Sequence, residues 1–323
     1  MDSLCSSPPT ITEELAKLQI DTNDEYLSVT IGTKFIPEKC SSFIHCDYLS
    51  IRMGRNIKLE RFDANFFRIL KKYYSEISHY YIDFNCAFQG NINRFIENFD
   101  YINELEIMCT LINDQDIDSM PNNIKKLDIY IYSGNNLRLL RFPTELESFS
   151  LRGCLDNISP IFPPKLKICN LIGSNFNQPL NNINIDLEEL LLGEVFNQPL
   201  ENLPLSLKRL TIKSEYFDQP LCYLPNLEEL ELNLSNKTYK NNFENLPVSL
   251  KKLKINFPYL DNNGLVGSSL DCLPDGIKDL EISYRNFPVI NKFPANLKKL
   301  VYHECPKLVK KNIRKIINIS IAS

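Results

Sequence analysis

A six-residue pattern recurs along most of this chain and constrains its fold more than any other feature. The pattern is L-x-x-L-x-L, in which Ile, Phe, Cys and once Tyr replace Leu, and ten segments match it. The matches are INELEI, IKKLDI, LESFSL, LKICNL, LEELLL, LKRLTI, LEELEL, LKKLKI, IKDLEI and LKKLVY, starting at residues 102, 124, 146, 166, 187, 207, 227, 250, 277 and 297. Weaker copies occur at 26–31, 46–51 and 77–82. Because the starts are 20 to 27 residues apart, the chain is an array of similar units.

Each copy of the pattern predicts a short β-strand that is buried on one face. We number the residues of a copy 1 to 6, and the residue after it 7. Positions 4 and 6 lie two residues apart, so their side chains share one face of a strand. Parallel strands of successive copies stack about 4.8 Å apart and bury that face together, so ten strands make a sheet roughly 50 Å long. We expect a leucine-rich-repeat solenoid, with a curved parallel sheet on its concave face and irregular or 3-10 turns on its convex face.

An apolar residue followed by proline precedes most of the predicted strands. The dipeptides are MP, FP or LP, and they stand at 120–121, 142–143, 162–163, 203–204, 224–225, 246–247, 273–274 and 293–294. Proline fixes φ and stops a helix, so it favours the turn that returns the chain to the next strand. The copy at Leu187 has Ile183-Asn184 instead, so the apolar residue recurs more regularly than the proline.

The pentapeptide FNQPL stands twice between predicted strands, and a variant, FDQPL, follows it. We interpret it as part of the scaffold, with Phe and Leu turned inward, Asn bonded to the backbone of the adjacent turn, and Pro stiffening the bend. A docking motif displayed to a partner is the less favoured alternative. The residues concerned are Phe176, Asn177, Pro179, Leu180, Phe196, Asn197, Pro199, Leu200, Phe217, Asp218, Pro220 and Leu221.

The complete unit resembles the FNIP repeat, a leucine-rich-repeat subfamily abundant in social amoebae and in giant viruses of amoebae. The resemblance is strict over about residues 166–250 and looser over about 100–305, where only the L/F-P and L-x-x-L-x-L parts remain. It implies a non-catalytic scaffold for protein–protein interaction. Some family members carry an N-terminal F-box that recruits a ubiquitin ligase, so a substrate-recognition adaptor is the alternative function.

The array is expected to have a cap at each end. Residues 1–100 form the predicted N-terminal cap region, 101–305 the repeats, about ten units, and 306–323 the C-terminal cap. A helix is predicted near 61–74, where apolar residues recur at helical spacing. We favour a capping helix there, because an array must cover its first apolar face. A degenerate F-box is less favoured, since that domain usually contains Trp and this chain has none.

The tail after residue 305 is basic, with five Lys and Arg residues and no acidic one. Such a cluster is compatible with a nuclear signal or an anion-binding patch. Its apolar residues favour a third reading, a closing helix whose basic side faces solvent. These apolar residues are Leu308, Ile313, Ile316 and Ile317.

Composition and charge exclude several classes of protein. The net charge is -4 and the pI is about 5.6, so no global basic field attracts nucleic acid or anionic lipid. No apolar run approaches the roughly 20 residues that span a bilayer. The N-terminus lacks the features of a secretory signal, and ten cysteines occur without CxxC spacing. We therefore expect reduced thiols, a cytoplasmic location (the host cytoplasm if the source is a virus) and a monomer.

No motif predicts catalysis or a bound cofactor. The three histidines, His45, His79 and His303, are not spaced with other ligands as a zinc site requires. No phosphate-binding glycine motif is present, and the proximity of His303 to Cys305 lacks a third, orienting group. We predict neither metal nor cofactor and no enzymatic activity; an unrecognised active site in the N-terminal region is a remote alternative.

The outward positions of the predicted strands carry alternating charges. At position 3 the sign changes at every step from Glu189 to Lys299, and position 2 alternates similarly. Side chains in such a ladder pair across strands and penalise slipped stacking, and alternation argues against a nucleic-acid groove. The ladder breaks in the middle, where we predict a protein-binding patch against the alternative of scattered surface apolar residues. The predicted patch consists of Tyr130, Arg152, Ile168, Ile172 and Leu191.

Overall fold

The computed structural model describes eighteen stretches of the chain. They are residues 27–32, 48–53, 79–84, 96–98, 100, 102–109, 115–117, 120–131, 137–139, 141–153, 162–181, 183, 186–235, 239, 243–258, 270–284, 292–303 and 318–322. Two compact units divide the chain, one of Met1–Leu146 with Asp156–Ile158 and the other of Glu147–Leu155 with Ser159–Ser323. In both units, the strands that match the predicted pattern begin at its third position.

The first unit contains the weaker copies and the first two full copies. Its main strands, in spatial order, are β1 (Leu27–Gly32), β2 (Tyr48–Met53), β3 (His79–Phe84), β4 (Glu104–Cys109) and β6 (Lys126–Ile131). Successive strands from β2 to β6 run parallel, whereas β1 runs antiparallel to β2. A separate parallel pair joins β5 (Gln115–Ile117) to β7 (Leu137–Leu139). The weaker copies are therefore strands of the same sheet.

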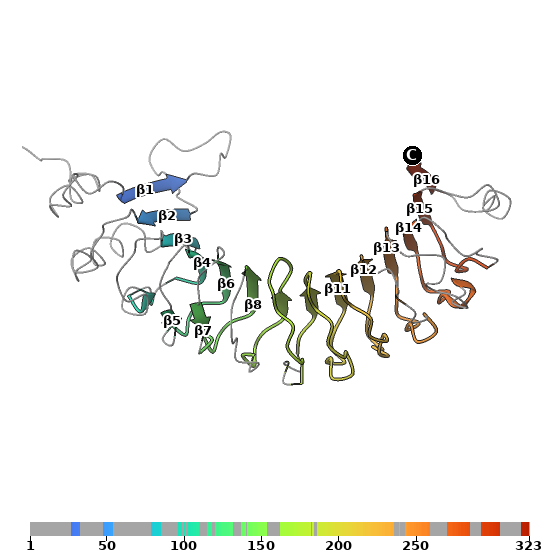
Figure 1. Ribbon diagram of the computed structural model, residues 1–323, viewed down its shortest axis with the longest axis horizontal. Helices are drawn as coiled ribbons and strands as arrows, with labels where there is room; N and C mark the ends of the chain where they lie inside the picture. Colours follow the sequence, from blue (N-terminus) through green and yellow to red (C-terminus); the bar gives the residue numbers. More distant parts are fainter. Residues whose placement is uncertain are drawn as a thin grey trace, which may run out of the picture. The chain divides into compact units, whose positions relative to one another are not determined.

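The second unit is a regular parallel array (Figure 1). Its strands are β8 (Ser148–Arg152), β9 (Ile168–Asn170), β10 (Glu189–Leu192), β11 (Arg209–Ser214), β12 (Glu229–Leu234), β13 (Lys252–Phe257), β14 (Asp279–Tyr284), β15 (Lys299–His303) and β16 (Asn318–Ala322). Each strand pairs in parallel with the next along the chain. Where the structure describes the connections, they consist of turns and irregular segments, with a short 3-10 helix at Leu270–Cys272. The predicted parallel solenoid is confirmed.

The predicted helical caps are not found in the part of the chain that the structure describes. The expected helix over 61–74 lies outside the described residues. The predicted C-terminal helix is wrong over residues 318–322. Asn318–Ala322 form the strand β16, which extends the sheet in register with β15. The signal was present in the sequence, since Ile316 begins a further copy of the pattern, IINISI.

The core of the second unit consists of the inward side chains at positions 4 and 6. Each is at most 2% exposed from β8 to β14. Burying a Leu or Ile side chain contributes about 1.5–3 kcal/mol, so the columns stabilise the array although each strand is short. The position 4 column runs Phe149, Cys169, Leu190, Leu210, Leu230, Leu253 and Leu280, and the position 6 column runs Leu151, Leu171, Leu192, Ile212, Leu232, Ile255 and Ile282.

A proline lies in most of the turns that lead into the strands; before β12 the turn closes instead on Leu224, whose carbonyl accepts from the Leu227 N–H at 3.1 Å. The N–H of position 1 donates to the carbonyl of the proline three residues earlier, as in Leu207 to Pro204 at 3.1 Å and Leu250 to Pro247 at 3.1 Å. The next two residues then bond to the preceding repeat, with the N–H groups of Lys208 and Arg209 both donating to the Glu188 carbonyl. This arrangement aligns position 2 of one repeat with position 2 of its neighbour.

Candidate functional site

The strand face of the second unit, opposite the buried columns, is the candidate functional site. Half-buried outward residues alternate with buried ones along the strands, as in β11 and β12. Adjacent strands place equivalent positions side by side, with Glu189 opposite Arg209 and Arg209 opposite Glu229. The outward face is therefore ordered in rows that cross the strands.

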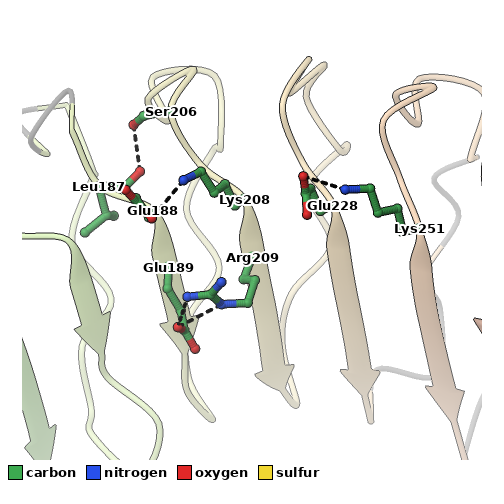
Figure 2. Close-up of polar contacts among 8 residues, drawn as sticks. All are labelled: Leu187, Glu188, Glu189, Ser206, Lys208, Arg209, Glu228 and Lys251. Carbon is green, nitrogen blue, oxygen red and sulfur yellow. Dashed lines mark hydrogen bonds and ion pairs between the residues drawn. The ribbon is translucent and has the colours of Figure 1, made fainter.

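The row at position 2 consists of matched ion pairs. Lys167 lies 3.7 Å from Glu147, Lys208 lies 3.0 Å from Glu188, and Lys251 lies 2.7 Å from Glu228. Figure 2 shows the last two pairs bridging neighbouring strands. The hydrogen bond from Lys208 lowers the pKa of the Glu188 carboxyl below its ordinary value of 4.5, and Lys251 does the same for Glu228. Both pairs are largely exposed, so each contributes little to stability alone.

The rows at positions 3, 5 and 7 extend this charge ladder. Arg209 donates to Glu189 from two nitrogens, and Lys252 lies 3.2 Å from Glu229. The hydrogen bond to Glu189 raises the pKa of the Arg209 guanidinium. Farther along the strands, Glu231 lies 3.5 Å from Lys213 and 3.8 Å from Lys254. Most ladder charges over β10–β13 are thus neutralised within the sheet.

The ladder is absent from positions 3 and 5 of β8 and β9 and from position 5 of β10. Ser148, Ile168, Asn170 and Leu191 are half-buried there, and the register sets Ser148 opposite Ile168 and Asn170 opposite Leu191. These residues form what we call the uncharged patch; Ile172 follows it just after β9, and the cationic Arg152 follows it at the end of β8.

The structure places four of the five predicted patch residues in this unit. Ile168 lies on β9, Leu191 on β10 and Ile172 just after β9, all half-buried, and Arg152 is exposed at the end of β8. Arg152 packs near Gly173, where an added Cβ would lie 3.7 Å from the Arg152 Cγ. Tyr130 lies on β6 in the first unit, half-buried. The second unit thus holds Arg152, Ile168, Ile172 and Leu191 without Tyr130.

The FNQPL residues lie on the turn side of the unit, away from the strand face. The rings of Phe176 and Phe196 stack with centroids 6.4 Å apart, and those of Phe196 and Phe217 with centroids 6.2 Å apart. All three are at most 5% exposed, and Leu180, Leu200 and Leu221 are buried beside them. The Phe and Leu of the motif are therefore core residues.

The asparagines of the motif form a ladder between repeats. The Asn177 Oδ1 accepts hydrogen bonds from the Asn197 N–H at 2.9 Å and from the Gln198 Nε2 at 3.1 Å. The Asn197 Oδ1 accepts equivalent bonds from the Asp218 N–H at 2.9 Å and from the Gln219 Nε2 at 3.1 Å. Asp218 is exposed, and so are Pro179, Pro199 and Pro220 in the bends. The polar residues of the motif thus join one turn to the next.

Two buried residues of this core were missed by the sequence reasoning. Ser214 is 2% exposed, donates to the Phe196 carbonyl at 2.8 Å and accepts from the Phe217 N–H at 3.1 Å. Tyr239 is fully buried and its ring stacks on Phe217, although its repeat lacks the pentapeptide. Its spacing from the preceding strand differs from that of the Phe residues, so no fixed interval in the sequence indicates it.

Metal-ligating and nucleophilic side chains do not cluster in the part of the chain that the structure describes. Among those residues no cluster of His, Cys, Asp and Glu could hold a metal ion, and no helix is long and apolar enough to cross a membrane. Burial raises the pKa of the Cys169 thiol, which makes it an inert core residue. His79 lies on β3 and His303 on β15, while His45 and Cys305 lie outside the described residues.

Comparison with known proteins supports the fold. No protein-family model matches the chain, and the search of curated proteins finds no match. Among solved structures, the chain is similar to CroV588, described as a circular LRR protein, with 19% identity and a TM-score of 0.51. The match covers 76% of this chain and 43% of that one, so this chain spans less than half of that protein's length. At this identity the likeness shows the fold alone, an LRR-like solenoid.

Proposed function

We propose that this protein is a non-catalytic scaffold that binds a protein partner through the uncharged patch. The observation that carries the proposal is the interruption of the charge ladder over β8 and β9 and at Leu191 of β10. Over β10–β13, carboxylates and basic side chains neutralise one another within the sheet. Solenoids commonly use the extended face of their sheet as a binding surface.

Ile168 and Leu191 of the uncharged patch, with Ile172 next to it, supply the apolar part of this surface. Their half-buried side chains retain apolar area that a partner would remove from water, at about 25 cal/mol per Å². Arg152 stands exposed at the end of the neighbouring strand, and Arg beside apolar residues is a common anchor in interfaces. Tyr130, half-buried on β6, is proposed as a separate binding residue of the first unit.

The repeat subfamily, the adaptor role, the cellular location and the oligomeric state are also proposals. FNIP membership is supported by the three pentapeptide motifs and by the LRR-like fold. The residues give no separate support to a ubiquitin-ligase adaptor role, which rests on that resemblance. A reducing, cytoplasmic setting is supported by the free cysteines Cys169 and Cys222, and we propose that the protein is a monomer.

Affinity purification followed by mass spectrometry tests the proposal. The wild-type protein and an Ile168→Lys/Leu191→Lys variant would each be used to capture proteins from host cytosol. Lysine is preferred to glutamate at 168, because Glu189 lies directly opposite and would oppose a second carboxylate. We expect the main partner to be lost from the variant. Skp1 and cullin proteins among the lost partners would favour the adaptor role.

A matched control separates loss of binding from loss of charge balance. Thr211 lies on β11 directly opposite Leu191, outside the patch and beside the ladder residue Glu231. Thr211→Lys adds one positive charge to the same face, against two in the patch variant, and should leave capture unchanged. The proposal fails if the patch variant melts like the wild type and still captures every partner.

A further inference from the structure

The row at position 2 changes character at its C-terminal end. Its first six members are the three Glu–Lys pairs described above, but the next two members are both lysines, Lys278 and Lys298. The Lys278 N–H donates to the Lys251 carbonyl at 2.7 Å, and the Lys298 N–H donates to the Lys278 carbonyl at 2.8 Å. Three lysines therefore stand in successive repeats, each directly before the start of its strand.

Two of these lysines have no counter-ion among the described residues. Lys251 pairs with Glu228, whereas no described carboxylate lies within ion-pair distance of Lys278 or Lys298, and both are exposed. Like charges on neighbouring strands destabilise a sheet. The row satisfies this rule at five successive neighbouring pairs and then breaks it at two, which indicates selection for something other than stability, as is expected at functional sites.

An exposed apolar side chain lies in the turn that leads into Lys251. Val248, in the turn before β13, is 81% exposed. The next turn lies directly against it, because a Cβ added to Gly276 would come within 2.5 Å of the Val248 carbonyl oxygen. Leu205 occupies the corresponding turn position two repeats earlier and is 63% exposed. The edge thus combines positive charge with apolar surface.

The acidic residues near this edge do not cancel its charge. Asp275 lies in the turn before β14, where its carboxylate accepts from the Ala295 N–H at 3.0 Å and lies 3.9 Å from Lys292. Asp279 follows Lys278 on β14 and projects from position 3. They place negative charge at intervals along the edge, which suits a ligand with separated charges.

We propose that this surface, formed by Val248, Lys251, Lys278 and Lys298 and called here the lysine edge, binds an acidic peptide segment of another protein that also carries apolar side chains. The lysines would contact its carboxylates, and Val248 would contact its apolar residues. An unbroken row of phosphates would be repelled by Asp275 and Asp279, which disfavours nucleic acid. The lysine edge lies at the start of strands β13–β15, away from β8–β10, so this inference is independent of the function proposed above.

Fluorescence anisotropy with a labelled probe tests the inference. The probe is a twelve-residue peptide of Leu-Glu-Glu repeated four times, compared with Ser-Glu-Glu repeated four times. We expect Lys278→Gln/Lys298→Gln to weaken binding of the first peptide about tenfold, as two screened charge contacts allow. Lys167→Gln, which removes a lysine from the paired part of the same row, should leave binding unchanged. Val248→Ser should weaken only the leucine-containing peptide.

Several outcomes would overturn the inference. Equal binding by the wild type and the double variant, or equal weakening by Lys167→Gln, would show that the edge is not the site. Tighter binding of a twelve-nucleotide single strand or of phosphatidylserine vesicles would reassign the lysines to nucleic acid or membrane. The melting temperature of the double variant should stay the same or rise, because like charges are removed. A fall would show that the lysines stabilise the fold instead.

Discussion

Arg209 donates two hydrogen bonds to a single carboxylate oxygen of Glu189, from Nη2 at 2.7 Å and from Nε at 2.9 Å. The two residues stand opposite each other on β10 and β11, twenty residues apart in the chain. Their contact joins consecutive repeats on the surface while the columns join them in the core. It therefore reports directly on the register of the sheet.

A double-mutant cycle would measure this contact. Glu189→Ala, Arg209→Ala and the double variant should give a coupling free energy of roughly 0.2–1 kcal/mol, since both side chains are partly exposed. Chemical denaturation of the four proteins supplies the values. The control cycle pairs Glu189 with Lys251, which lies two strands beyond Arg209, and should give no coupling. A zero value for Glu189 and Arg209 would contradict the role of the ladder in register.

Phe196 lies between two other aromatic rings and is fully buried. We expect Phe196→Ala to reduce the free energy of unfolding by about 3–5 kcal/mol, because it leaves a cavity in the aromatic column. Urea denaturation checks this value. Glu201→Ala, an exposed change a few residues away, should have little effect. Wild-type stability of Phe196→Ala would mean that the ring is dispensable to the scaffold.

Asn197 is the acceptor in the second step of the asparagine ladder. Asn197→Ala leaves the Asp218 N–H and the Gln219 amide without this acceptor, so we expect a loss of about 1 kcal/mol. Asn197→Asp keeps an acceptor oxygen and should retain more stability than the alanine variant. Thermal and urea denaturation would rank the two. If both variants matched the wild type, the ladder would be incidental to stability.

Tyr239 carries its hydroxyl into the core, where the described structure offers it no hydrogen-bond partner. Burial raises the pKa of Tyr239, in keeping with an apolar setting. Because an unsatisfied buried polar group costs about 1–3 kcal/mol, Tyr239→Phe should stabilise the protein or leave it unchanged. The midpoint of urea denaturation is the measurement. A clear loss of stability would show that the hydroxyl is bonded in solution.

The carboxylates of the ladder should make the free energy of unfolding depend on pH in the acidic range. Lys208 and Lys251 hold the pKa values of Glu188 and Glu228 below the ordinary 4.5. Groups with lowered pKa values stabilise the folded state above that pH, and the contribution is lost as pH falls through the folded values. Urea midpoints measured from pH 7 to pH 3 should therefore decline below about pH 4.5. Glu188→Gln/Glu228→Gln should flatten the decline; an unchanged profile would exclude these pairs as its cause.

The sequence by itself determined which face of each strand is buried. Alternation at positions 4 and 6 places Leu190 and Leu192 inward and Glu189 and Leu191 outward wherever the strand is set, because side chains alternate along a strand. All ten predicted copies are strands for that reason. The same local logic located the turns, since proline closes them within three residues.

Only the tertiary structure decided which outward side chains meet. Repeats of unequal length must be brought into register before Lys251, Lys278 and Lys298 align in one row, and a step of 27 residues separates the first two. The alternating row predicts an ion pair between Asp279 and Lys299. These residues lie opposite each other on β14 and β15, but they form no ion pair with each other. Tyr239 likewise enters the aromatic column from a connection of different length. A strand's own residues determine its buried face, but contacts between repeats depend on how the intervening chain packs.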